Sequence, residues 1–123
     1  MTSPRSDLRS GVRLTVAEVE PTIPREGLRS TSAFQHGSML VKLYEPRGTD
    51  PQTPHTRDEV YVVVSGRGQF VAGDRRQPFG PGDLLFVPAG MVHRFEAFTD
   101  DLALWVVFYG PEGGEATQGG GKP

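Results

Sequence analysis

The sequence predicts an all-β domain built as an antiparallel sandwich or barrel. Sixteen glycines and eleven prolines are spread along the 123 residues, and they separate short runs rich in Val, Leu, Phe and Tyr. Short apolar runs bounded by turn-forming residues are typical of β-strands, and they leave little room for helices. A sandwich or barrel is the natural closure for such strands because it removes or shortens the exposed sheet edges.

The first expected strand covers residues 12–19, where Val, Leu and Val alternate with polar neighbours. A period of two is expected of a half-buried strand. Residues 20–37 contain two prolines and little periodicity, so they are expected to form an irregular connection that packs over the barrel. A second strand is expected at residues 39–44.

Residues 59–64 (EVYVVV) are β-branched on both faces of the expected strand. Such a strand is expected to be covered on both sides, either inside a sandwich or against another subunit, so a homodimer is one of the two expected arrangements. Residues 68–72 are expected to pair back on this strand across residues 65–67, and another tight turn is expected at residues 72–74. The remaining expected strands are residues 83–88, 93–98 and 102–109.

The length of the chain indicates one domain. Its charge gives no electrostatic reason to bind nucleic acid or a membrane surface. The formal net charge is −2, with basic and acidic residues interspersed. No stretch approaches the roughly 20 apolar residues of a membrane span, and residues 1–10 lack the apolar segment of a secretory signal, so a cytoplasmic location is expected. Residues 1–10 and the Gly-rich residues 110–123 are expected to be flexible tails, because they cannot bury enough surface to offset the ordering entropy.

Two histidines and a carboxylate, His55, Glu59 and His93, are the candidate metal ligands. The chain has no cysteine, so a metal ion would have to bind nitrogen and oxygen. Two imidazoles and one carboxylate make a three-sided donor set for a divalent transition metal and leave coordination positions open. Metal occupancy is expected to fall as the pH drops through about 6.5, where free imidazoles protonate. The alternative is a buried polar cluster, in which the carboxylate is hydrogen-bonded to the imidazoles without an ion.

The spacing of His55 and Glu59 requires a bend in the chain. In an unbroken strand their side chains would face the same side but lie about 13 Å apart, too far for one ion bound at about 2 Å by each. Residues 56–58 (TRD) suit such a bend, and the proline just before His55 disfavours regular pairing there. His93 follows the turn-forming sequence PAG, so it is expected to enter the site from a different strand.

The residues next to the three donors are assigned by alternation and by turn chemistry. Tyr61 shares the face of Glu59 and is the candidate catalytic residue, as a proton donor or a hydrogen-bonding partner of a ligand; the alternative is a core aromatic residue with its hydroxyl at the rim. Asp58 is expected to be a turn residue with a solvated charge. Arg94 is expected at the surface, because alternation turns it away from the face of His93.

At these residues the sequence resembles the cupin superfamily, whose two motifs run H-x-H-x(3,4)-E-x6-G and G-x5-P-x-G-x2-H-x3-N. The resemblance covers roughly residues 38–109 and implies a single-domain jelly-roll β-barrel, which we expect to occupy residues 11–109. The matching positions are His55, Glu59 and Gly66 in the first motif and Gly82, Pro88, Gly90 and His93 in the second.

Two positions depart from the cupin motifs. Thr53 stands in place of the first histidine of the first motif, and Ala97 in place of the closing asparagine of the second. A neutral hydroxyl is a weak metal donor, so water, Gln52 or a residue from elsewhere is expected to fill the vacant position. The remaining histidine, His36, is expected to be a surface or loop residue.

The resemblance implies metal-assisted chemistry on a small organic molecule, either of the dioxygenase type or of the isomerase or lyase type. The expected cofactor is a divalent transition metal, Fe, Mn, Zn or Ni. The alternative is a barrel that holds a metal ion or small ligand as a sensor, without turnover, because one fold hosts many functions.

Overall fold

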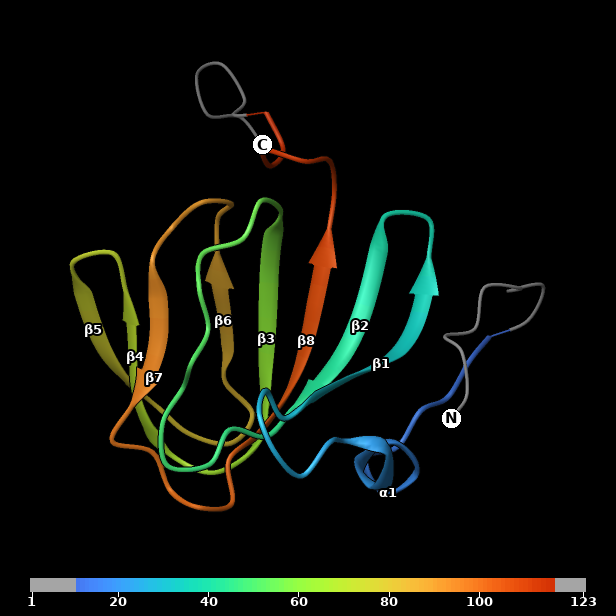
Figure 1. Ribbon diagram of the computed structural model, residues 1–123. Helices are drawn as coiled ribbons and strands as arrows, with labels where there is room; N and C mark the ends of the chain where they lie inside the picture. The colour runs from blue at the N-terminus through green and yellow to red at the C-terminus, as the bar shows by residue number, and fades with distance from the viewer. Residues whose placement is uncertain (1–10, 117–123) are drawn as a thin grey trace.

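The computed structural model describes residues 11–116, which form two antiparallel β-sheets packed against each other (Figure 1). This arrangement confirms the predicted all-β jelly-roll. In sheet order, the five-stranded sheet consists of β1 (Ser30–His36), β2 (Met39–Tyr44), β8 (Ala103–Tyr109), β3 (Asp58–Ser65) and β6 (Leu84–Val87). The three-stranded sheet consists of β5 (Arg75–Phe79), β4 (Gly68–Ala72) and β7 (His93–Glu96).

The main hydrophobic core lies between the two sheets. Tyr61 and Val63 of β3 project into it from the larger sheet, and Phe70 and Phe95 project from the smaller one. The ring centroids of Tyr61 and Phe95 lie 5.0 Å apart. Because side chains on a strand alternate between faces, the same inner face of β3 also carries Glu59, next to the core.

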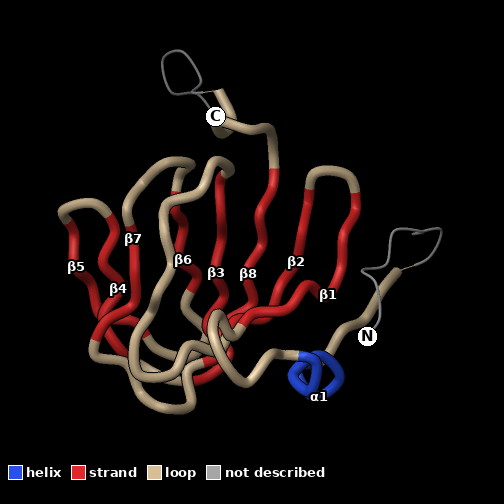
Figure 2. The backbone as a smooth tube through the Cα atoms, viewed as in Figure 1, coloured by secondary structure: helices blue, strands red, loops and turns tan. Residues whose placement is uncertain are grey.

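The N-terminal segment is helical where the alternation over residues 12–19 predicts a strand. It forms helix α1 (Val16–Val19), followed by the 3-10 helix η1 (Glu20–Thr22), and α1 lies at the end of the larger sheet (Figure 2). Thr15 and Glu18 form a reciprocal capping box: the Thr15 hydroxyl accepts the Glu18 N–H at 3.1 Å, and the Glu18 carboxylate accepts the Thr15 N–H at 3.0 Å. These bonds satisfy two main-chain N–H donors at the N-terminus of the helix. Their effect outweighs the preference for a strand that the alternating apolar residues predict.

Residues 20–37 are not an irregular connection throughout, because β1 lies within them. β1 pairs with β2 through a tight turn in which Gly37 has a φ of 59°. The sequence signal is weak because β1 is an edge strand that contains no Val or Ile. The face of β2 that points away from the main core carries Leu43. The N-terminal segment covers this face, because Val19 and Ile23 pack against Leu43.

Residues 65–67 carry the chain from one sheet to the other instead of forming a hairpin. β3 pairs with β6 and β8, whereas β4 pairs with β5 and β7, so the predicted pairing of β3 with β4 is wrong. The turn predicted at residues 72–74 is confirmed by the β4–β5 hairpin. The sequence does not predict β5, the second strand of this hairpin. Gly66 has a φ of 94°, and a Cβ added there would lie 2.6 Å from the Cα of Leu102.

The outer face of β3 and β6 is apolar and partly open. Val60 pairs with Phe86 and Val62 with Leu84, and Leu84 and Phe86 are 64% and 49% exposed. The covering of this face by a second copy of the chain stays a prediction. Among the residues that the structure describes, no helix is long and apolar enough to cross a membrane.

Ala97, at the end of β7, is strained. It is the one non-glycine residue with a positive φ, 50°, in the described part of the chain. The left-handed conformation costs most L-residues about 1–2 kcal/mol, and asparagine adopts it more readily. We expect Ala97→Asn to raise the free energy of unfolding by about 1 kcal/mol, and Ala97→Gly to raise it less, because glycine loses more entropy on folding.

Urea denaturation at a fixed m-value measures both changes. Ala72→Gly in β4 serves as the control, because glycine in a strand with ordinary backbone angles lowers stability by about 0.5–1 kcal/mol. A lower denaturation midpoint for both Ala97 variants would show that the backbone at this position is not strained.

Candidate metal centre

The three predicted donors meet where β3 begins. The Glu59 Oε1 atom lies 2.6 Å from His55 Nε2 and 3.2 Å from His93 Nε2, and the two Nε2 atoms are 3.3 Å apart. Glu59 projects from β3, His93 begins β7 in the opposite sheet, and His55 lies in the loop before β3. The chain bends at residues 56 and 57. The predicted bend and the predicted entry of His93 from another strand are therefore confirmed.

Main-chain carbonyls fix the orientation of both imidazoles. The Nδ1 atom of His55 lies 2.9 Å from the Arg57 oxygen, and that of His93 lies 2.9 Å from the Met91 oxygen. A carbonyl oxygen only accepts, so each Nδ1 carries the proton and each neutral ring presents the lone pair of Nε2. Both lone pairs and the Glu59 carboxylate converge, and such a group of acceptors needs a proton or a cation among them.

The spacing of these atoms fits a metal ion. Two ligand atoms bound at about 2.1 Å with tetrahedral or octahedral angles are about 3.0–3.4 Å apart. The separations of 3.2 Å and 3.3 Å that involve His93 fall in this range, and the His55–Glu59 separation of 2.6 Å is that of a short hydrogen bond. The group could hold a divalent metal ion on nitrogen and oxygen donors.

His93 also binds a proton more tightly than a free imidazole does. Burial by itself lowers the pKa of His93, but hydrogen bonds to the Glu59 carboxylate and the Met91 carbonyl outweigh this effect, and the pKa lies above its ordinary value. Protons and a metal ion therefore compete for the same Nε2 lone pair.

Asp58 is buried, which corrects the expectation of a solvated turn residue. It is 6% exposed, and its carboxylate accepts the Ala89 N–H and the Glu115 N–H, each at 2.9 Å. These main-chain donors lie in segments without strand partners, so a buried acceptor is needed there. The Gly90 N–H also donates to the His55 carbonyl at 2.7 Å. Asp58 thus positions the loop that carries His55 against the loop that precedes His93.

The beginning of the Gly-rich segment expected to be a flexible tail is bonded to the domain. The Gly113 N–H donates to the Thr56 carbonyl, and Glu115 is bonded to Asp58. The segment therefore contacts the chain between His55 and Glu59, at Thr56 and Asp58. The rest of that predicted tail, residues 117–123, and the predicted N-terminal tail, residues 1–10, lie outside the described residues.

Tyr61 lies beside the three donors and is fully buried. Its hydroxyl oxygen lies 3.1 Å from His93 Nε2, and its proton is donated to Gln52 Oε1 at 2.8 Å. Gln52 in turn donates to the Asp50 carboxylate at 2.7 Å. Burial and then the charge of Glu59 raise the pKa of Tyr61 well above its ordinary value, so the phenol stays neutral.

The remaining predicted residues lie away from the three donor atoms. Thr53 lines the neighbouring pocket, and Gln52 contacts Tyr61 but is not part of the donor group. His36 is exposed at the end of β1, and Arg94 is exposed and paired with Glu96, so both surface predictions are confirmed. The sequence does not single out Asp50, because nothing in RGTDPQ distinguishes it from an ordinary loop residue.

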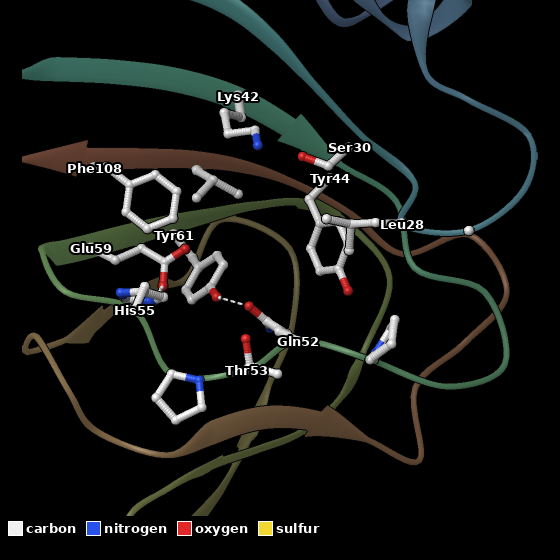
Figure 3. A pocket seen from close by; sticks show the side chains of 14 residues that line it. Leu28, Ser30, Lys42, Tyr44, Gln52, Thr53, His55, Glu59, Tyr61 and Phe108 are labelled. Atoms are coloured by element: carbon white, nitrogen blue, oxygen red, sulfur yellow. Dashed lines mark hydrogen bonds and ion pairs between the residues drawn. The ribbon is translucent and has the colours of Figure 1, made fainter.

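A pocket of about 480 Å³ opens beside the donors (Figure 3). Its wall is mainly apolar, with Leu28, Val106 and Phe108 among the lining residues, and Glu59 and His55 lie at one end. A mostly apolar cleft of this size with a few convergent polar groups is typical of a small-molecule site.

The fold and the site together define a small jelly-roll protein with a two-histidine, one-carboxylate group that could hold a metal ion. The model of the cupin domain matches residues 40–109, and the chain belongs to the cupin family. An uncharacterized protein of Streptomyces coelicolor is 43% identical over 77 residues, which cover 61% of this chain and 73% of that one.

Solved structures similar to this chain share its fold. A cupin 2 conserved barrel domain protein from Salinispora arenicola superposes with a TM-score of 0.63 at 18% identity, covering 82% of this chain and 89% of that one. A Thermus thermophilus protein superposes with a TM-score of 0.64 at 24% identity, covering 80% and 97% of the two chains. At these identities the likeness establishes the architecture alone.

Proposed function

We propose that the protein binds a divalent transition metal through His55, Glu59 and His93 and acts on a small organic molecule in the adjacent pocket. The observation that supports this proposal most strongly is the convergence of two Nε2 lone pairs and one carboxylate, with both rings held by carbonyls at Nδ1. Fe, Mn, Zn and Ni all accept such donors. A bound ion would supply Lewis-acid chemistry or, with iron, dioxygenase-type chemistry.

Tyr61 is the residue of this chain best placed to exchange a proton with the bound molecule. Its hydroxyl lies within hydrogen-bond distance of His93 Nε2, and it lines the same pocket as His55 and Glu59. The phenol is neutral and its O–H donates to Gln52 Oε1, which fixes its orientation. It can act as a general acid when a bound molecule replaces Gln52 as the acceptor of this proton.

Elemental analysis of the purified protein tests the metal site. We expect about one transition-metal ion per chain in the wild type, and a loss of at least tenfold in His93→Ala, which removes a buried ligand. His36→Ala is the matched control, since it removes an exposed histidine outside the donor group. Equal metal content in the wild type and His93→Ala would refute the proposed ligands.

A sensor that holds a metal or small ligand without turnover is the second candidate, because the same fold and donor set serve binding as well as catalysis. Loading the protein anaerobically with Fe(II) and following O2 consumption with catechols, dicarbonyls and thiols separates dioxygenase activity from binding. Consumption that is lost in Tyr61→Phe while the metal is retained would assign the proton-transfer role to Tyr61. Silence across the panel would favour the sensor.

A further inference from the structure

Lys42 faces the interior of the protein from β2. Alternation turns Lys42 and Tyr44 toward the inner face of the sheet, whereas Leu43 faces outward against the N-terminal segment. Lys42 is half-buried and lines the pocket (Figure 3). Within residues 11–116, the ion pairs involve other side chains and leave Lys42 without a carboxylate partner.

Two opposite charges line the pocket, and they do not form an ion pair with each other. Lys42 and Glu59 carry the charges among its lining residues, and the Glu59 carboxylate is already bonded to His55 and His93. A divalent ion at the donors would turn that end of the pocket from negative to positive, and Lys42 adds a second positive group. Positive charge beside apolar walls is costly until an anion neutralises it. The pocket therefore favours a ligand with negative charge.

The strand register gives the backbone separation between the two ends of the pocket. Lys42 pairs with Val106 of β8, and Val106 pairs with Tyr61 of β3. Two strand spacings, about 10 Å, therefore separate the backbones at Lys42 and Tyr61. Val106 and Phe108 form the apolar wall between the two ends. A ligand that contacts both ends needs an apolar body, with its charge at one end.

We propose that Lys42 binds the carboxylate of the pocket's ligand, so that the ligand class is small organic carboxylates with an apolar, ring-sized body. A second oxygen of the ligand faces the end with His55 and Glu59. This inference rests on the proposed function in taking the pocket as the ligand site, but the contact with Lys42 does not require the metal ion.

Calorimetric titration tests the contact with a panel of benzoate, phenylacetate, 3-phenylpropanoate and 3-(4-hydroxyphenyl)propanoate, each paired with its uncharged methyl ester. We expect the wild type to bind at least one acid at least tenfold more tightly than its ester, because a charge-assisted hydrogen bond is lost with the charge. Lys42→Met and Lys42→Gln should abolish this difference, and Lys42→Arg should keep most of it. Arg75→Met, which removes an exposed positive charge on β5, is the matched control and should bind like the wild type.

The titrations are carried out on zinc-treated and on metal-free protein, with the zinc content of each sample measured. Acid binding that is equal in the wild type and the folded Lys42 variants, or no preference for acids over esters across the panel, would overturn the inference. A wild type that takes up no zinc but still binds acids through Lys42 would overturn the metal proposal alone. Circular dichroism melts show which variants are folded.

Discussion

In the Glu59→Gln variant, we expect zinc to lose its stabilising effect on the protein. A ligand that binds only the folded state at 100 times its dissociation constant adds about 2.7 kcal/mol to the free energy of unfolding. For a domain of this size that corresponds to a rise in Tm of about 10 °C. Glutamine keeps the volume of Glu59 but replaces an anionic ligand with a neutral amide, so the rise should shrink to about 1 °C or less.

Thermal melts with and without Zn²⁺, and again after addition of EDTA, measure this effect. Glu26→Gln removes an exposed carboxylate outside the donor group and should keep the full rise. Mg²⁺ should have little effect on the wild type, because it prefers oxygen ligands in octahedral geometry. A full zinc-dependent rise in Glu59→Gln would mean that zinc binds elsewhere.

We expect Gly66→Ala to destabilise the domain strongly. The added Cβ would lie 2.6 Å from the Cα and 3.0 Å from the nitrogen of Leu102, a residue that is fully buried in the core. Backbone atoms cannot move aside as a flexible side chain does, so this clash adds about 1–3 kcal/mol to the cost of a left-handed alanine. The total loss of unfolding free energy should be about 3 kcal/mol.

Gly82→Ala separates the two contributions. Gly82 has a φ of 88°, similar to Gly66, but a Cβ there would have no neighbour within 4 Å. Only the backbone strain remains, so Gly82→Ala should cost about 1–2 kcal/mol. Urea denaturation of the two variants gives the difference. Equal losses would show that the close approach to Leu102 is relieved by a small shift of the chain.

The sequence predicts best the strands that are buried, because their side chains form apolar runs. The apolar runs at residues 59–64 and 102–109 form β3 and β8, which lie inside the larger sheet. β1 and β5 lack that signal, because β1 is a half-buried edge strand and most of β5 is exposed. The capping box of Thr15 and Glu18 was present in the sequence, and weighing it above three alternating apolar residues would have predicted α1.

Strand pairing depends on information that a local pattern does not contain. A short Gly-containing link is typical of a hairpin, yet residues 65–67 connect two sheets, because β3 finds its partners in β6 and β8. The close packing of Gly66 on Leu102 joins residues far apart in the chain. No local pattern specifies it.

In the candidate site too, the local sequence predicts some residues, whereas the roles of others depend on contacts made by folding. The donors His55, Glu59 and His93 could be predicted because few side chains bind metals and their spacing demanded a bend. Asp58 and Asp50 could not be assigned, because their partners are main-chain groups, an amide and the Tyr44 hydroxyl, which the fold brings together. The role of a buried carboxylate in a loop depends on which donors surround it, and these become known only with the structure.

The bond between Glu115 and Asp58 has a practical consequence for expression of the protein. A histidine-rich affinity tag that replaces residues 117–123 would start next to Glu115, close to the loop that carries His55, and could capture the same ion by its high local concentration. Helix α1 lies at the opposite end of the larger sheet (Figure 1). A cleavable tag joined directly before residue 11 would start at that end of the sheet, away from His55, Glu59 and His93. Such a tag would not compete with these three donors for the ion.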